Sequence, residues 1–468
     1  MAGEPQNAPG SKRVGTDLTQ GGILKTLITF AVPIVLTNLL QLIYSMVDLS
    51  VIGQFVGNTG TIGVSVGGEL ADIGTALATA FSAGGQIYIA QLVGARDNDR
   101  LKETISTLLT WMLLLSVLFG GGMLLFHHQM LQMLNCPASA YTQARSYLMI
   151  TALGLPFICG YNAICGILRG MGESKAPLYF IIVAASVNIV LDVLLVAVIP
   201  LEAAGTAIAT VLSQLGAFLA AFRFFYRRRE QFGFKLRVSY FRIRWQSLRV
   251  ILLLGVPKLV QTMCIQFTLL WCSSNINSYG EVVSAANSIG NKLQKLVTMF
   301  TVSFETASSA MIGQSLGRGD QERARKTVWT ALRCTMTVAA FGSVAALLFP
   351  RVLFRIFTPD AAVLDYGVLY MRIMVITFIT AACLSAFSSM VNGSGFAAMS
   401  FALGIMDGVV FRVGFSLLFL YAFHLGPVSF FLGNALARAA PASISFVYFI
   451  SGRWKRRKLL VEAPETKS

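Results

Sequence analysis

Long apolar runs recur along the whole chain, and clusters of charged residues separate them. Each run has about 20 or more residues, the length that a helix needs to cross the hydrocarbon core of a membrane. Only 12% of the 468 residues are charged, about half of the share that is usual in soluble proteins. The sequence therefore predicts an all-α membrane protein that crosses the bilayer many times.

The apolar runs predict twelve spans, at residues 23–53, 70–93, 105–126, 147–168, 177–200, 203–226, 250–279, 284–314, 328–349, 365–392, 399–423 and 428–450. Lysine and arginine concentrate in alternate connections, such as those that hold Arg96 and Arg100 or Arg318 and Arg323. By the positive-inside rule, this asymmetry predicts that both termini are cytoplasmic. The expected location is the bacterial inner membrane.

Composition divides the chain into five parts. Residues 1–22 are polar, rich in Gly and Pro and without the apolar core of a signal peptide, so we expect a disordered cytoplasmic tail. A basic cytoplasmic linker at 227–249 separates two six-helix lobes at 23–226 and 250–450, and a basic tail follows at 451–468. The net charge is +16, but the basic residues that produce it cluster in the connections on one side of the membrane, so no nucleic-acid partner is expected.

The two halves resemble each other at an offset of about 223 residues. AQLVGARDNDRLKETI at 90–105 aligns with GQSLGRGDQERARKTV at 313–328, and Tyr147 aligns with Tyr370. Six spans per half give both repeats the same orientation, so the axis relating them lies along the membrane normal, as in transporters that bind substrate between two halves. A duplicated helical bundle without transport is the alternative.

The first span carries four polar residues at steps of three and four: Asn38, Gln41, Ser45 and Asp48. This spacing places them on one helical face. Such a stripe can join helices by hydrogen bonds, but a carboxylate at mid-membrane costs about 2.5–3.5 kcal/mol and usually lines an ion pathway. Pro33, earlier in the same span, removes a backbone hydrogen bond and provides a hinge.

The fifth and sixth spans supply further oxygen-bearing side chains. Asn188 and Asp192 lie four residues apart and share a face, and Thr210 follows in the sixth span. Together with Asp48 these residues offer a set suited to Na⁺ or to a shared proton. We therefore expect the coupling ion to bind in the N-terminal half.

In these motifs the chain resembles the multidrug and toxic compound extrusion (MATE) family of the MOP superfamily, in its prokaryotic, DinF-like branch. The resemblance is carried by VPxxxxNLLQxxYxxVDxxxIG in the first span, by SVNIVLDV in the fifth, and by QxxGARD with its repeat QxxGRGD. It covers residues 19–454 and implies two pseudo-symmetric six-helix lobes and export driven by inward H⁺ or Na⁺ flow. In that branch the positions matching Asp48, Asn188, Asp192 and Thr210 form the cation site.

The second half does not repeat this chemistry, because Cys272 stands at the counterpart of Asp48 and Arg412 near that of Asp192. Another branch of the family uses a glutamate in span 7, where this chain has Gln266. The intramembrane charges Glu305, Asp407 and Arg412 either pair with each other or line the substrate cavity. Candidates for lining that cavity are Tyr44, Asn162, Gln266, Glu305, Asp407 and Arg412.

The repeat also predicts an external gate. Glu69 and Asp72 begin the second span, and the offset of 223 leads to Lys292 and Lys295 at the start of the eighth. These opposite charges are expected to meet across the lobe interface when the protein faces inward. The alternative is that all four side chains are solvated at the mouth of the cavity.

These observations predict a secondary active exporter of amphipathic, cationic drugs or metabolites that works by alternating access and uses H⁺ or Na⁺ as its coupling ion. We expect a monomer among membrane lipids, with no other cofactor. A lipid-linked oligosaccharide flippase of the same superfamily is the alternative, and it would be expected to have a cationic central cavity. The sequence shows no nucleophile–base or metal cluster that would indicate an enzyme.

Overall fold

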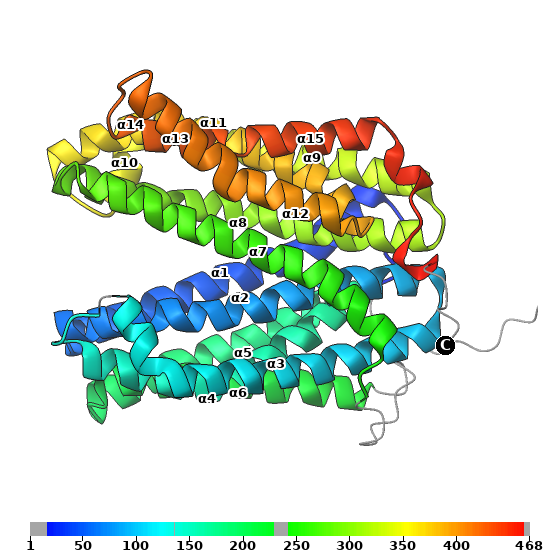
Figure 1. Ribbon diagram of the computed structural model, residues 1–468, viewed down its shortest axis with the longest axis horizontal. Coiled ribbons are helices and arrows are strands. Elements are labelled where there is room, and N and C mark those ends of the chain that lie inside the picture. The colour runs from blue at the N-terminus through cyan, green and yellow to red at the C-terminus, as the bar shows by residue number, and fades with distance from the viewer. Residues whose placement is uncertain (1–15, 135, 229–241, 463–468) are drawn as a thin grey trace, which may run out of the picture.

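The computed structural model describes residues 16–134, 136–228 and 242–462, and within these ranges it contains helices and no β-strand. Residues 1–15 of the expected N-terminal tail, 229–241 of the expected linker and 463–468 of the expected C-terminal tail lie outside the described residues. Figure 1 shows long helices that run side by side, with the N-terminal half along one side of the molecule and the C-terminal half along the other.

The helices of the N-terminal half are α1 (Ile23–Phe55), α2 (Asn58–Ala95), α3 (Asn98–Met133), α4 (Tyr141–Gly170), α5 (Lys175–Asp192) and α6 (Glu202–Arg227), with a π-helical turn at Val193–Val198. Several helices are longer than the predicted spans. α2 begins at Asn58 rather than at residue 70. The apolar pattern missed its first turns because they contain many Gly, Ser and Thr residues, which lower the local hydropathy.

The C-terminal half contains α7 (Trp245–Asn277), α8 (Glu281–Gly317), α9 (Gln321–Leu348), α10 (Pro350–Arg355), α11 (Ala361–Gly393), α12 (Ala397–Ile405), α13 (Phe411–Tyr421), α14 (Val428–Leu436) and α15 (Ala439–Ile450). A second π-helical turn, Met406–Val410, joins α12 to α13, and short 3₁₀ turns follow at Arg453–Arg456 and Leu460–Glu462.

Eleven helical segments of the described residues are long and apolar enough to cross a membrane, and they correspond to all predicted spans except the eighth. The helix in that position, α8, has 37 residues but also carries Asn287, Lys292, Gln294 and Glu305. Its position explains this composition, because α8 packs against α9 and α11 and also against α1 and α2 of the other half. The protein is a multi-pass helical membrane protein.

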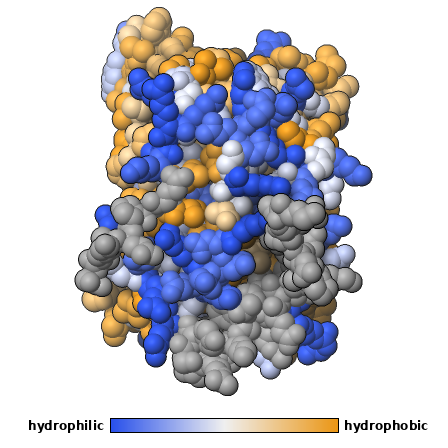
Figure 2. All heavy atoms as spheres, turned by 90° about the vertical axis from the view of Figure 1, so that its right-hand side faces the viewer, coloured by the Kyte–Doolittle hydropathy of each residue, from blue (hydrophilic) through white to orange (hydrophobic). Residues whose placement is uncertain are grey.

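The periphery of the bundle is apolar, as a lipid-facing surface requires. On α3, for example, Val117, Leu118 and Leu125 are more than half exposed. The basic connections after α2 and α8 lie at one end of the bundle together with the C-terminal 3₁₀ turns, which they contact through Arg100 and Gln321. We call this the basic end. Figure 2 looks onto the basic end and shows hydrophilic side chains across it and hydrophobic ones along the flanks.

The two halves touch closely at the basic end. A Cβ atom added at Gly94 of α2 would lie 2.1 Å from the carbonyl oxygen of Gln314 on α8, and one added at Gly84 would lie 3.0 Å from the backbone nitrogen of Gly255 on α7. Glycine permits this approach because small residues let helix backbones pack directly together. Glu69, Asp72, Lys292 and Lys295, predicted to begin their spans, instead lie 12 to 15 residues into α2 and α8, in the half of the bundle away from the basic end, and all four are exposed.

Candidate functional site

Two helices of the N-terminal half bring three of the four predicted cation ligands together, and α6, which carries the fourth, Thr210, packs beside them. Asp48 of α1 lies beside Asn188 and Asp192 of α5, and α6 packs against both helices. The side chains of Asp48, Asn188 and Asp192 are 8%, 1% and 0% exposed. Two carboxylates and an amide that are far apart in the sequence therefore share one buried site.

The oxygen atoms of this site lack partners. Among the described residues, Asp48 Oδ1, both carboxylate oxygens of Asp192 and both polar atoms of the Asn188 amide make no hydrogen bond, and neither does the Thr210 hydroxyl on α6. The ion pairs of the described residues do not include Asp48 or Asp192 either. Since a buried acceptor without a partner is costly, the site has the composition of one that takes a cation or a proton.

The backbone changes form beside Asp192. The α5 helix ends at this residue and continues as the π-helical turn Val193–Val198. Single π-helical turns within α-helices occur frequently at functional sites. The wider turn places the carboxylate at a break in regular hydrogen bonding rather than in the middle of a uniform helix.

Sequence reasoning assigned no role to further polar side chains on α6, the helix that packs against α1 and α5, or to Tyr147 of α4. Thr206 and Gln214 on α6 are buried, and neither the Thr206 hydroxyl nor Gln214 Oε1 has a hydrogen-bond partner among the described residues. Tyr147 of α4 lies within electrostatic range of both carboxylates. Thr206, Thr210 and Gln214 repeat every four positions, and this polar spacing in an apolar span was the signal that could have identified them.

The polar stripe of α1 divides between two neighbours. Asn38 Nδ2 donates a 2.9 Å hydrogen bond to Ser303 Oγ on α8, whereas Ser45 Oγ donates to the carbonyl of Gln41 in its own helix. Pro33 lies inside the continuous α1 helix, and its carbonyl accepts a 2.8 Å bond from the Thr37 hydroxyl. The stripe thus joins α1 to the other half at Asn38 and to the buried site at Asp48.

The charged residues of the C-terminal half pair with each other. Arg412 Nη2 donates to Asp407 Oδ1 at 3.0 Å, and the two side chains are 1% and 4% exposed. Arg412 also donates to Asn434 Oδ1. The sequence left pairing and cavity lining open for these two residues; they form a closed pair and do not reach solvent, because the π-helical turn at Met406–Val410 brings positions five apart together.

Glu305 has a separate partner, since its Oε1 accepts a 2.9 Å hydrogen bond from Asn392 Nδ2. Arg438, between α14 and α15, lies within electrostatic range of Glu305 and Asp407. The repeat gave no signal for Arg438. Asp407 and Glu305 therefore each have an arginine or amide donor as a partner, whereas no ion pair of the described residues includes Asp48 or Asp192.

The other residues predicted for a substrate cavity are scattered. Gln266 is exposed on α7, and Asn162 Nδ2 donates to the Ile158 carbonyl in its own helix. Tyr44 is half-buried and lies within electrostatic range of Asp48 and Asp72. Of these residues, only Tyr44 adjoins the buried carboxylates.

The four predicted gate residues are solvated in this conformation. Asp72 lies within electrostatic range of Lys295 across the halves, but among the described ion pairs none joins them within 4 Å. Lys292 Nζ lies 5.9 Å from the ring centre of Phe357 instead. The predicted contact is therefore not formed in this structure, and the external gate stays a prediction.

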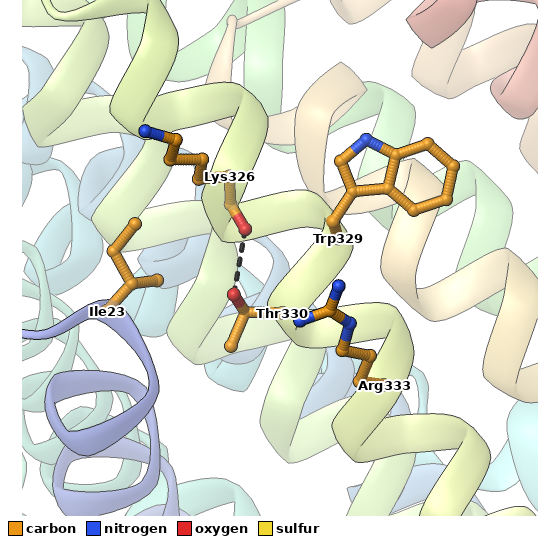
Figure 3. Close-up of a pocket in the computed structure, with 5 residues that line it drawn as sticks. All are labelled: Ile23, Lys326, Trp329, Thr330 and Arg333. Carbon is orange, nitrogen blue, oxygen red and sulfur yellow. Dashed lines mark hydrogen bonds between the residues drawn. The ribbon is translucent and has the colours of Figure 1, made fainter.

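A surface pocket lies elsewhere, at the basic end where α1 begins beside α9. It is lined by Ile23, Lys326, Trp329, Thr330 and Arg333 (Figure 3). The Thr330 hydroxyl donates to the Lys326 carbonyl at 2.8 Å. The pocket shares no residue with the buried carboxylate site. Within the described residues no group of three or more His, Cys, Asp or Glu could hold a metal ion.

Comparison with known proteins gives a consistent result. A family model described as MatE matches the chain twice, over residues 33–194 and 257–418, once in each half. The chain is 28% identical over 447 residues to the probable multidrug resistance protein YpnP of Bacillus subtilis, covering 95% of this chain and 99% of that relative. It is 22% identical over 451 residues to the probable multidrug resistance protein NorM of Thermotoga maritima, covering 94% of each chain.

Solved structures share the fold. A MOP superfamily transporter from Pyrococcus furiosus superposes with a TM-score of 0.89 at 20% identity, covering 96% of this chain and 100% of that one. A structure described as the outward-facing conformation of a multidrug resistance MATE family transporter also has a TM-score of 0.89, at 21% identity and with the same coverage.

Proposed function

Because the chain belongs to the MatE family of membrane transporters, we propose that it exports small amphipathic organic compounds in exchange for an inward-moving cation, H⁺ or Na⁺. The coupling ion binds at Asp48, Asn188, Asp192 and Thr210. The basic end faces the cytoplasm of a bacterial cell, as the positive-inside rule predicts. The protein works as a monomer.

The observation that carries this proposal is the contrast between the two halves. The carboxylates of Asp48 and Asp192 are buried, and within the described part of the chain no hydrogen bond reaches Asp48 Oδ1 or either oxygen of Asp192, whereas Asp407 is held by Arg412. A bound cation is favoured at a carboxylate that has no basic side chain as its partner, because a carboxylate paired with an arginine is already neutralised. This supports coupling in the N-terminal half.

Ion binding drives transport through the shape of the site. Loading the site with H⁺ or Na⁺ neutralises part of the charge between α1 and α5 and lets the two helices approach. Pro33 provides the hinge in α1, because no backbone hydrogen bond forms at its nitrogen. The ion shifts the protein between states only if it binds them with unequal affinity.

The substrate class follows from the same charges. Tyr44 lies within electrostatic range of Asp48 and Asp72, and Glu69 and Asp72 of α2 are exposed. Acidic and aromatic side chains beside apolar helices favour an amphipathic organic cation over an anion. This agrees with the relatives YpnP and NorM, which are named as probable multidrug resistance proteins.

Transport by proteoliposomes tests the proposal. The protein would be reconstituted with a fluorescent organic cation, and an H⁺ gradient or a Na⁺ gradient would be imposed separately. We expect movement of the dye against its gradient with one of the two ions, which identifies the coupling ion. Dye movement that neither gradient accelerates would contradict coupled export.

A charge exchange tests the external gate that the repeat predicts. Asp72→Lys and Lys295→Asp should each slow dye export several-fold, because each places like charges at the interface when the halves close. The double variant restores the attraction and should recover export to near the wild-type rate. If the double variant is correctly inserted but its rate of dye export stays as low as in the single variants, the latch is excluded.

A further inference from the structure

Two glutamines at matched positions of the repeat join the halves at the basic end. Gln91 of α2 donates through Nε2 to the carbonyl of Gly393, the last residue of α11, at 2.8 Å. Gln314 of α8 donates to the carbonyl of Gly170, the last residue of α4, at 2.9 Å. Both glutamines are buried, at 0% and 1% exposure. Each amide therefore closes the end of a helix in the opposite half.

The oxygen of each amide accepts from a segment near one end of the chain. Gln314 Oε1 accepts a 3.2 Å bond from the backbone nitrogen of Leu18, and Gln91 Oε1 accepts a 3.3 Å bond from that of Leu460. We call residues 16–21 the N-terminal segment and residues 459–461 the C-terminal segment. In each glutamine, therefore, the amide nitrogen donates to the end of a helix and the amide oxygen accepts from a terminal segment.

Matched arginines hold the same two segments. Arg323 donates to the carbonyls of Leu18, Gln20 and Gly21 at 2.8–3.1 Å. Arg100, which the repeat offset relates to Arg323, donates to the Val461 carbonyl at 2.7 Å. Both arginines are positioned by a helix cap, because Asp97 accepts from the backbone of Arg100 and Asp320 from that of Arg323.

Matched glycines provide room for the contact. A Cβ atom added at Gly317 would lie 2.1 Å from the carbonyl oxygen of Gln91. A Cβ atom added at Gly94 would lie equally close, 2.1 Å, to the carbonyl oxygen of Gln314. Gly172 has a φ of +86°, and a Cβ atom added to it would lie 2.3 Å from the Thr16 carbonyl oxygen. Gly395 has a φ of +72°, and a Cβ atom added to it would lie 2.5 Å from Leu460 Cδ1. Only glycine adopts this backbone conformation at low cost.

Each segment is joined covalently to one half and by hydrogen bonds to the other. The N-terminal segment continues into α1 but contacts Gln314 and Arg323 of the C-terminal half, with Leu18 fully buried. The C-terminal segment follows α15 but contacts Gln91 and Arg100 of the N-terminal half. Separation of the halves at this end must therefore release both segments.

We infer that Gln91 and Gln314 are paired gate residues that hold the basic end shut, and that the two segments are part of this gate and must leave for it to open. The gate residues are positioning residues: they set the balance between conformations and touch no coupling ion. The inference rests on the alternating-access part of the proposed function, but it is independent of the ion and of the substrate.

Distance measurement between spin labels tests the gate directly. Asn98→Cys on α3 and Arg325→Cys on α9, both exposed at the basic end, would carry the labels in a variant without the native cysteines, in lipid nanodiscs. A single short distance is expected with both glutamines present. Loss of one hydrogen-bonding amide, in Gln91→Ala or Gln314→Ala, should raise the ratio of long to short distances about fivefold, and the double variant should raise it further.

Gln132→Ala is the matched control, because Gln132 is an exposed glutamine of α3 that bonds only His128 at the opposite end among the described residues. Arg100→Ala and Arg323→Ala test the segments without altering the glutamines, and Arg351→Ala, at the opposite end, is their control. The arginine variants should also lengthen the distance. If the distance distribution stays unchanged in both glutamine variants, the gate inference is wrong. If the distances lengthen in the glutamine variants but not in the arginine variants, the two segments are not part of the gate.

The readout separates this inference from the proposed function. Spin-label distances report the separation of the halves whether or not a dye is transported, so a wrong coupling ion or substrate leaves the result readable. If the double glutamine variant aggregates on size-exclusion chromatography, the single variants and the arginine variants decide the outcome.

Discussion

Replacement of Asp48 by asparagine is expected to abolish ion-driven export while the protein stays folded. Asparagine keeps the size of the side chain but removes the negative charge that lies beside Asn188 and Asp192. Without unequal ion affinity in the two states, the ion gradient cannot drive the conformational change. We expect the initial rate of gradient-driven dye transport by proteoliposomes to fall at least about tenfold, as a loss of about 1.4 kcal/mol in ion binding would produce.

The matched control is Asp365→Asn, because Asp365 pairs with Arg351 on the surface and is 66% exposed. This variant should transport at the wild-type rate. If Asp48→Asn also transports at the wild-type rate under the same gradient, the buried carboxylate site does not couple the ion, and Glu305 becomes the next residue to replace.

Replacement of Arg412 by alanine is expected to cause the largest loss of stability. The change leaves the buried Asp407 carboxylate without its ionic partner, and removal of one member of a buried ion pair typically costs about 3–5 kcal/mol. Asn434, whose side-chain oxygen accepts from Arg412, loses a donor as well. We expect a clearly lower thermal unfolding midpoint in detergent micelles.

Replacement of both partners separates charge from packing. Asp407→Leu with Arg412→Met should recover most of the lost stability, because an apolar pair of similar volume removes the unpaired charge. Arg351→Ala breaks an exposed pair and should change the stability by less than about 1 kcal/mol. Equal midpoints for Arg412→Ala and Arg351→Ala would show that the buried pair contributes no more than the exposed one.

Much of the architecture could be predicted because it depends on local pattern. Helices in a membrane are set by the length of apolar runs, and eleven of the twelve predicted spans correspond to apolar helices. The exception, α8, carries polar residues along a helix that packs between other helices. Apolarity reports contact with lipid, so it is a weaker signal for a helix that faces protein.

The repeat indicated which positions correspond but not what they contact. It aligned Gln91 with Gln314 and Arg100 with Arg323, yet the sequence contains no sign that these side chains bond segments near the two ends of the chain. Such contacts join residues roughly 300 or more positions apart. They exist only once both halves are folded and packed.

The sequence by itself determined the membrane class, the duplicated halves and the identity of the acidic residues on α1 and α5, because helical periodicity and span length are local properties. Only the tertiary structure decided that Asp407 is satisfied by Arg412, whereas Asp48 Oδ1 and both oxygens of Asp192 lack hydrogen-bond partners in the part of the chain that the structure describes. The physical reason is that a buried charge is stabilised or left unpaired by its neighbours in space. Which helices become neighbours follows from the packing of the whole bundle.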